Sequence, residues 1–115
     1  MYKILLVDDE HISREMLSTY VEGLLGYEVV QARSGEHGWD LFSEGDFQII
    51  LSDIKMPGMN GIELLKKIKS TPKGKHVKMV LFTGFAQVET AVDALREGAY
   101  DYLFKPIDVT RLGEI

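Results

Sequence analysis

The sequence contains no cysteine, so it can form neither a disulfide framework nor a thiolate metal site. It also contains no long apolar run, because the apolar amino terminus gives way to acidic residues at Asp8, too early for a signal peptide or a membrane span. Acidic residues outnumber basic ones, and the net charge of −5 at pH 7 argues against nucleic-acid binding. We therefore expect a cytoplasmic protein that directly contacts neither membrane nor nucleic acid.

The length and composition of the chain are those of one globular domain. A chain of 115 residues, 45% of them hydrophobic, can bury roughly two-thirds of its unfolded surface, which is enough for a single core. A last helix from Asp108 to Ile115 would span only about 12 Å, which is short for a helix that covers a sheet. We expect residues 1–115 to be one domain at the amino-terminal end of a longer protein.

Short apolar runs alternate along the sequence with longer segments of helical period. The expected strands are residues 4–7, 28–31, 47–51, 77–82 and 100–104. The expected helices are residues 11–25, a segment capped by Ser34, a segment opened by the capping-box pair Asn60 and Glu63, a segment from Val88 that is closed by Gly98, and the segment after Asp108. Strict alternation predicts an α/β fold with a doubly wound, five-stranded parallel sheet and helices on both faces.

The first of these helices has a regular apolar pattern. Ile12, Met16, Tyr20 and Leu24 recur every four residues with Leu17 and Val21 beside them, and Gly26 follows as a helix stop. Such a repeat predicts an amphipathic helix with an apolar side toward the core.

Polar residues follow the expected strands at points where packing does not require them. Asp53 comes after the apolar run 47–51, and a carboxylate at the end of a buried strand is costly unless a charged group pairs with it. The other strand ends carry Asp8, Asp9 and Glu10 after the first strand, Thr83 and Gly84 after the fourth, and Lys105 and Pro106 after the fifth. Because the carboxyl ends of parallel strands share one edge of the sheet, these groups can converge.

The chemistry of these groups favours a phosphorylation site. Three carboxylates in one cleft repel each other without a counter-ion, and Mg²⁺ (with Mn²⁺ as a possible substitute) binds carboxylates, keeps waters and bridges to phosphate oxygens. Lys105 supplies a point charge suited to phosphate, and Thr83 supplies a hydroxyl donor. With Asp53 as a carboxylate nucleophile, the set suits formation of an aspartyl-phosphate.

With these motifs the chain resembles the receiver domains of response regulators in two-component signalling. The motifs are Leu6-Val7-Asp8-Asp9-Glu10, Asp53-Ile54-Lys55-Met56-Pro57 with Gly61, Thr83-Gly84 and Lys105-Pro106. The resemblance covers essentially the whole chain. By similarity to the chemotaxis member of the family, which is itself a worked case of the rule for doubly wound sheets, it implies a flavodoxin-like (βα)5 fold with strand order 2-1-3-4-5.

The resemblance also assigns roles to the acidic residues. Asp53 would accept a phosphoryl group from a phosphohistidine on a sensor histidine kinase or phosphotransfer protein. Asp9 and Asp53 would bind Mg²⁺ directly, Asp8 would bind it through water, and the backbone carbonyl of Lys55 would complete the protein ligands.

The same resemblance implies a switch. Lys105 would pair with the phosphate, and a cis peptide bond between Lys105 and Pro106 would turn the lysine inward. Thr83 would hydrogen-bond the phosphate and vacate space into which Tyr102 turns from solvent. This movement would reshape the face formed by the fourth helix, the fifth strand and the last helix, where a homodimer could form. An output domain is expected on the carboxyl-terminal side.

Two positions are expected to set the lifetime of the phosphorylated state. They are Lys55 and Phe85, which lie two residues beyond Asp53 and Thr83. Neither side chain is suited to orient an attacking water, and Phe85 is bulky enough to shield an acyl phosphate. We therefore predict slow self-dephosphorylation, and no catalytic activity beyond this and self-phosphorylation.

Three other functions compete with this interpretation. A phosphatase that forms an aspartyl-phosphate would carry a second acid two residues beyond a nucleophile on the first strand, whereas Asp8 and Asp9 are adjacent. A flavodoxin-like electron carrier needs a phosphate-cradling loop in place of these acids. A receiver-like interaction module without phosphorylation would tolerate loss of Asp53 or Lys105, yet both are present.

The stretch from Gly98 to Asp108 resembles receivers attached to transcriptional activators of the ATPase type.

Overall fold

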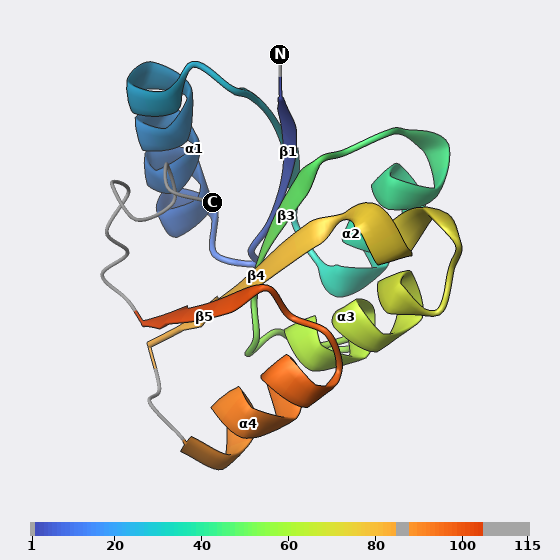
Figure 1. The fold of residues 1–115 in the computed structure, drawn as a ribbon. Helices are drawn as coiled ribbons and strands as arrows, with labels where there is room; N and C mark the ends of the chain where they lie inside the picture. Colours follow the sequence, from blue (N-terminus) through green and yellow to red (C-terminus); the bar gives the residue numbers. More distant parts are fainter. Residues whose placement is uncertain (1, 85–87, 105–115) are drawn as a thin grey trace.

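The computed structural model describes residues 2–84 and 88–104, which form a five-stranded sheet with helices on both sides (Figure 1). The strands are β1 (Lys3–Val7), β2 (Glu28–Ala32), β3 (Ile49–Asp53), β4 (Lys78–Thr83) and β5 (Asp101–Phe104). The helices are α1 (His11–Leu25), α2 (Gly35–Glu44), α3 (Gly61–Lys69), the 3₁₀ turn η1 (Lys73–His76) and α4 (Val88–Arg96). The expected last helix after Asp108 lies outside the described residues.

The strand order is β2-β1-β3-β4-β5, and all four neighbouring pairs are parallel. This confirms the predicted doubly wound, flavodoxin-like topology with order 2-1-3-4-5. Strand β3 lies at the centre, and all five of its residues are buried. Burial on both faces explains why β3 reads as a continuous apolar run and shows no alternation.

Two apolar layers cover the two faces of the sheet. Successive side chains of a strand point to opposite faces, so Leu5 and Val7 of β1 belong to one core cluster and Ile4 and Leu6 to the other. The first cluster includes side chains of α2, α3 and α4, and the second includes Val21 of α1. In Figure 1, α1 lies on one side of the sheet and α2, α3 and α4 on the other.

The predicted span of α1 is confirmed, and its buried side is the one through Leu17 and Val21. Ile12, Met16, Tyr20 and Leu24 are each more than half exposed, whereas Val21 is 1% exposed. A helix turns about 100° per residue, so Tyr20 points well away from the direction of Val21. The residues that pack on the sheet are spaced alternately by four and three positions along the helix. The row that repeats strictly every four residues lies beside this face.

Strands β3 and β4 end slightly later than the sequence predicted, so the functional residues at their ends are part of the sheet. Strand β3 begins at Ile49 and continues through Asp53, which pairs with Phe82 of β4. Strand β4 likewise extends to Thr83. Asp53 and Thr83 are therefore the last residues of their strands and are held by the sheet itself.

The caps of α2 and α3 fix the loops that lead into these helices. Ser34 caps α2, because its Oγ accepts a hydrogen bond of 3.0 Å from the N–H of His37. Asn60 and Glu63 form the predicted capping box at α3, with bonds of 2.9 and 3.1 Å. Within the described part of the chain, no helix combines the length and the apolarity that crossing a membrane requires.

Candidate functional site

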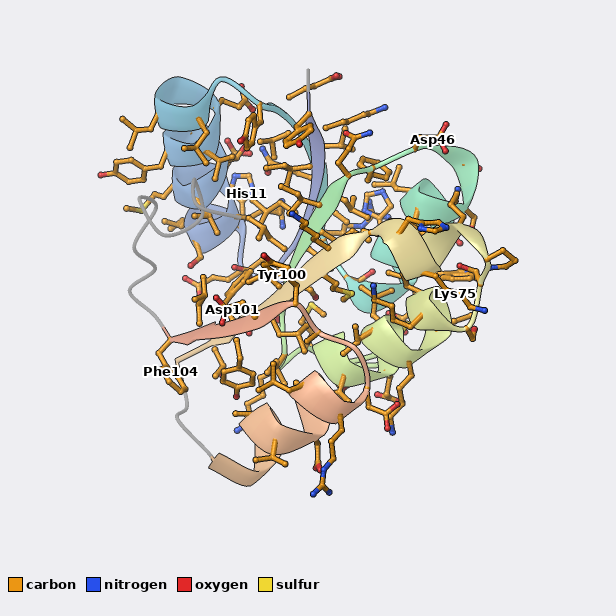
Figure 2. The ribbon with its side chains drawn as sticks, viewed as in Figure 1. His11, Asp46, Lys75, Tyr100, Asp101 and Phe104 are labelled. Carbon is orange, nitrogen blue, oxygen red and sulfur yellow. The ribbon has the colours of Figure 1, made fainter. Side chains whose placement is uncertain are left out.

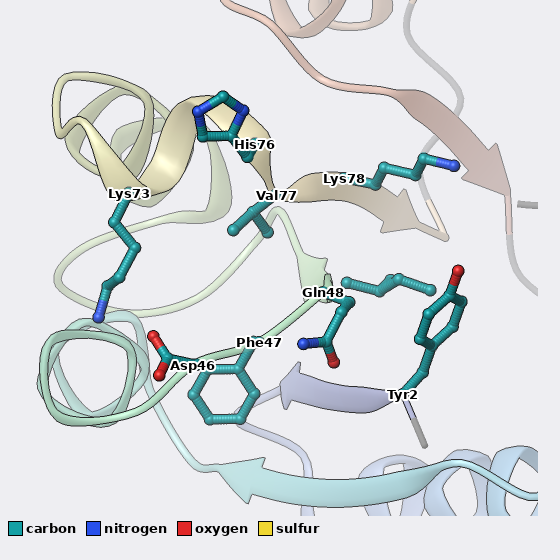
Figure 3. Close-up of a pocket in the computed structure, with 9 residues that line it drawn as sticks. Tyr2, Asp46, Phe47, Gln48, Lys73, His76, Val77 and Lys78 are labelled. Carbon is teal, nitrogen blue, oxygen red and sulfur yellow. The ribbon is translucent and has the colours of Figure 1, made fainter.

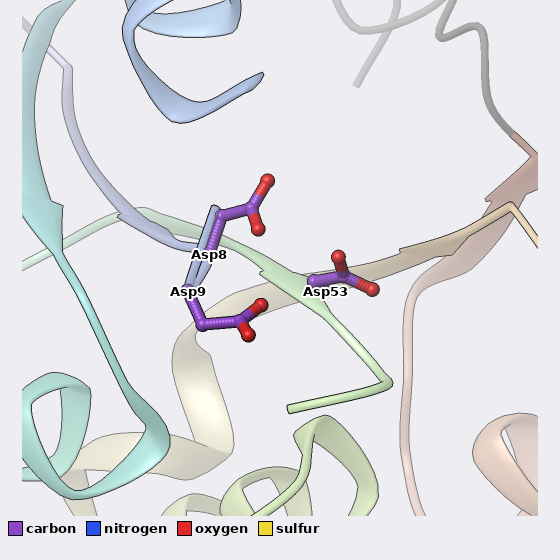
Figure 4. Close-up of side chains that lie close together, drawn as sticks. All are labelled: Asp8, Asp9 and Asp53. Atoms are coloured by element: carbon purple, nitrogen blue, oxygen red, sulfur yellow. The ribbon is translucent and has the colours of Figure 1, made fainter. Parts of the chain in front are cut away.

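The carboxyl edge of the sheet brings together three aspartates, of which Asp53 is far in the sequence from the adjacent pair Asp8 and Asp9. Asp8 and Asp9 follow β1, and Asp53 ends β3 beside it. Carboxylate oxygens of the three residues all lie within 4.8 Å of one another (Figure 4). Asp8 and Asp53 are buried, with 1% and 7% of their surface exposed, whereas Asp9 is exposed.

Asp8 is held in place from both sides of its backbone. Its N–H donates to the carbonyl of Ala32 at 3.1 Å, and its own carbonyl accepts a 2.9 Å bond from Nη1 of Arg14. Its carboxylate Oδ1 accepts a 3.0 Å bond from the N–H of Glu10. Arg14 also donates from Nε to Gln31 of β2 at 3.0 Å, so α1 is tied to two strands at this edge. The sequence analysis missed Arg14, because a single basic residue in the first turns of a helix carries no distinctive signal.

Asp53 is oriented by the turn that follows it. Its Oδ1 accepts a 3.3 Å bond from the N–H of Lys55, and the N–H of Ile54 donates to the carbonyl of Phe82 at 3.1 Å. Gly61 at the start of α3 lies directly against the Asp53 carbonyl, where a Cβ atom would overlap backbone atoms. The helix can therefore begin this close to the acidic edge only because position 61 has no side chain.

A hollow of about 620 Å³ opens between these groups. Its lining residues are Asp9, Glu10, Asp53, Lys55, Met56, Pro57, Thr83 and Gly84. Thr83 is 3% exposed, and its position at the end of β4 places a hydroxyl in the same hollow as the carboxylates. Lys105, Pro106 and Phe85, which the sequence analysis also assigned to this site, lie outside the described residues.

A second hollow, of about 340 Å³, lies at the opposite, amino-terminal edge of the sheet (Figure 3). Its lining includes Asp46, Lys73 and His76 but none of the residues predicted to carry chemistry. Lys73 Nζ donates to the carbonyls of Phe42 and Gly45 at 2.6 and 2.8 Å, which ties η1 to the end of α2. The converging polar groups therefore single out the hollow at the carboxyl edge.

The acidic cluster fits a hard divalent cation. Two buried carboxylates and one exposed one within 4.8 Å repel each other strongly unless a cation or protons neutralise them. The donors are all oxygen atoms, which Mg²⁺ prefers, and the chain has no cysteine for a softer metal. Solvent in the adjoining hollow can supply the waters that Mg²⁺ usually retains.

Tyr102 of β5 is buried in this structure, whereas the resemblance implies a side chain that turns inward from solvent. Its side chain is buried, with 8% exposed, and its hydroxyl has no hydrogen-bond partner among the described residues. Burial raises the pKa of this hydroxyl. The ring centroid lies 5.4 Å from that of Phe104, which is 50% exposed and is visible at the end of β5 in Figure 2.

Comparison with known protein families agrees with this geometry. Residues 4–115 match the response regulator receiver domain, and the chain belongs to this family. Phosphorylation and Mg²⁺ binding are characteristic of the family, which serves two-component signalling. The chain is therefore a receiver domain, which is a signalling domain.

Curated relatives are response regulators that are much longer than this chain. The chain is 43% identical over 113 residues to the regulatory protein AtoC of Escherichia coli K12, a match that covers 98% of this chain and 24% of AtoC. It is 40% identical over 111 residues to the transcriptional regulatory protein ZraR of Salmonella typhimurium, covering 96% of this chain and 24% of ZraR. The chain thus spans about a quarter of the length of these relatives.

Solved structures share the whole fold. The chemotaxis protein CheY4 of Vibrio cholerae superposes with a TM-score of 0.91 at 30% identity, covering 99% of this chain and 94% of CheY4. The response regulator TrrA of Thermotoga maritima, solved in complex with Mg(2+)-BeF, gives a TM-score of 0.87 at 31% identity, covering 99% of this chain and 95% of TrrA. The chain therefore has the CheY-like receiver fold.

Proposed function

We propose that this chain is the phosphoacceptor domain of a two-component phosphorelay, in which Asp53 takes a phosphoryl group from a phosphohistidine of a sensor histidine kinase or phosphotransfer protein. The observation that carries the proposal is the meeting of the buried Asp53 with Asp8 and Asp9, in a hollow that Thr83 also lines. Packing alone gives no reason to collect three carboxylates at one edge of a sheet.

In the proposed reaction, Asp53 acts as the nucleophile. One carboxylate oxygen forms the new O–P bond while the N–P bond to the donor histidine breaks, and the histidine nitrogen leaves with the electron pair. The N–H of Lys55, which donates to Oδ1, helps to hold the carboxylate in a fixed orientation. Thr83 and Lys105 bind the phosphoryl oxygens, Thr83 through its hydroxyl and Lys105 as a point charge.

The Mg²⁺ ligands proposed for this chain are Asp9 and Asp53 directly, Asp8 through water, and the backbone carbonyl of Lys55. A bound ion would offset part of the negative charge of the carboxylates and of the phosphoryl group. TrrA, a structural neighbour, has been solved with Mg(2+)-BeF.

The signal is proposed to leave the domain through the face that α4 and β5 form with the last helix. The phosphoryl group on Asp53 would carry about two negative charges, in place of the single charge of the carboxylate, and strong hydrogen-bond acceptors, which can bias a two-state packing element. Thr83 and Tyr102 form that element, and the face that they reshape contacts an output domain or a second copy of the chain. AtoC and ZraR are about four times as long as this chain, which supports a carboxyl-terminal output domain in a cytoplasmic parent protein.

Slow loss of the phosphoryl group is also part of the proposal. The side chain of Lys55 is poorly suited to orient an attacking water, and Phe85 is bulky enough to shield the acyl phosphate. Both positions therefore favour a long-lived phosphorylated state.

The proposal is tested by incubating the chain with Mg²⁺ and acetyl phosphate and measuring the intact mass. We expect the parent to gain one phosphoryl group, and we expect Asp53→Asn to gain none. The matched control is Asp46→Asn, which removes an exposed carboxylate at the opposite edge of the sheet and should be phosphorylated like the parent. Removal of Mg²⁺ with a chelator should abolish the gain. Equal labelling of the parent and Asp53→Asn would refute the proposal.

A further inference from the structure

The loop between β3 and α3 carries the Lys55 carbonyl, and its two ends are anchored by backbone bonds. At the first end, Ile54 N–H donates to Phe82 of β4 at 3.1 Å. At the other end, Gly61 N–H donates to the Ile54 carbonyl at 2.9 Å, and Asn60 takes part in the capping box of α3. The position of Lys55 therefore depends also on what holds the middle of the loop.

The middle of the loop is held by a side chain from another element. Glu36, in the first turn of α2, accepts a 3.1 Å hydrogen bond from the N–H of Met59 through Oε2. Gly58 precedes Met59 with φ of +73°, and a Cβ atom at Gly58 would lie only 2.5 Å from the same oxygen. The carboxylate thus occupies the space beside the left-handed residue that turns the loop.

Helix α2 is positioned to present Glu36 in this way. Its first residue, Gly35, lies so close to the carbonyl of Met59 that a Cβ atom would overlap it. Ser34 caps the helix, so the first turn is fixed before it meets the loop. Hydrogen bonds from the N–H groups of Glu36 itself and of Met59 lower the pKa of the Glu36 carboxyl, so the acceptor is ionised at neutral pH.

We propose that Glu36 is a positioning residue: by holding the loop at Met59 it sets how well the Lys55 carbonyl can serve the acidic site as a Mg²⁺ ligand. This inference rests on the proposed function, because it assumes that Asp8, Asp9 and Asp53 bind Mg²⁺. Groups that orient a metal ligand without touching the metal commonly change its affinity by about tenfold or more.

Two simpler explanations make different predictions. If Glu36 acted only through its negative charge, any neutral replacement would weaken Mg²⁺ binding. If it acted only by stabilising the fold, any comparable loss of a loop hydrogen bond would have the same effect on binding. Glu63 supplies the comparison, because its Oε1 accepts a 3.1 Å bond from Asn60 N–H at the other end of the same loop.

The experiment is a calorimetric titration with Mg²⁺ of the parent and of three variants, each first shown to be folded by circular dichroism. We expect Glu36→Ala to weaken Mg²⁺ binding by about tenfold, and we expect Glu36→Gln, which keeps an acceptor oxygen, to bind within about twofold of the parent. The control Glu63→Ala loses a similar bond and the same charge, yet we expect its Mg²⁺ affinity to be unchanged.

Each other outcome overturns the inference. Parent-like binding by Glu36→Ala would show that the bond to Met59 does not position the ligand. Equal weakening by Glu36→Gln would show that charge is responsible, and equal weakening by Glu63→Ala would point to stability. If the parent itself binds no Mg²⁺, the proposed function and this inference fail together, whereas a binding parent with an unaffected Glu36→Ala refutes this inference alone.

Discussion

The unpartnered hydroxyl of Tyr102 leads to a prediction about stability. A buried polar group without a hydrogen bond has lost its contacts with water and gained nothing in return, which costs about 1–3 kcal/mol. Tyr102→Phe removes the hydroxyl and leaves the ring, which lies 5.4 Å from that of Phe104. We therefore expect the substitution to stabilise the folded domain, although most substitutions of buried residues destabilise.

The size of the effect can be worked out for a chain of this length. The entropy of unfolding is about 2.1 cal/mol/K per residue, or about 0.24 kcal/mol/K for 115 residues. A gain of 1–3 kcal/mol then raises the Tm by about 4–12 °C. The control is Tyr100→Phe, because Tyr100 precedes β5 and is 52% exposed, and surface substitutions usually change stability by less than about 0.5 kcal/mol.

Thermal unfolding followed by circular dichroism gives the first measurement, and ultraviolet titration of the tyrosines gives the second. Because burial raises the pKa of Tyr102 above the ordinary value of 10.0, the folded state keeps this proton to higher pH than the unfolded state. Ionisation of Tyr102 therefore adds to the cost of burial: the stability of the domain does not change with this group below pH 10 and falls as the pH rises from 10 through the raised value. Tyr102→Phe should remove both this fall and a tyrosine that ionises above pH 10. A fall in Tm of the size expected for a lost hydrogen bond would refute the reasoning.

Two further predictions concern the loop after Asp53. Gly61→Ala should destabilise the domain by about 1–3 kcal/mol in urea unfolding, because the new Cβ meets the backbone of Asp53 and Ile54, which cannot move aside as a side chain could. Gly23→Ala, in α1, has nothing within 4 Å of the new atom and should not destabilise; equal losses in both variants would contradict the packing argument. For Glu36, whose carboxyl has a pKa lowered from 4.5, the stability from its hydrogen bonds is present above pH 4.5 and is lost as the pH falls through the lowered value. The Tm difference between the parent and Glu36→Ala, which loses these bonds, should therefore shrink on acidification, and a difference that does not change with pH would contradict this assignment.

Much of the fold could be predicted because it depends on local patterns. Apolar runs of strand length, separated by segments of helical period, are enough to predict alternating βα units and a parallel sheet. The caps were predictable for the same reason, since Ser34 and the Asn60–Glu63 pair act on backbone groups only three residues away. The strand order came from family resemblance, because local patterns do not specify which strands are neighbours.

The buried face of α1 could not be read from the sequence with the same certainty. Two apolar rows run along this helix about 100° apart, one through Met16 and Tyr20 and the other through Leu17 and Val21. Either row satisfies the helical period. Packing against the sheet decided between them, and that choice depends on the path of the chain, which the pattern of one helix does not record.

The acidic site was predictable, and the residues that support it were not. Asp53 and Thr83 stand out because polar side chains are unexpected at the ends of buried strands. Glu36 and Arg14 are ordinary charged residues in the first turns of helices, and each acts on a backbone atom remote in sequence or on another loop. Such contacts depend on tertiary structure, so neither the composition of the chain nor the spacing of its residues indicates them.

The acidic cluster and Tyr102 share one physical property that links them to signalling. Both are arrangements that the folded domain holds at a cost: carboxylates within 4.8 Å of one another, and a buried hydroxyl without a partner among the described residues. A ligand shifts an equilibrium only by its difference in affinity for the two states. A cation relieves the repulsion between the carboxylates, whereas the phosphoryl group brings further negative charge to the same site. The proposed phosphorylation therefore depends on a bound cation, and the chelator experiment tests that dependence directly.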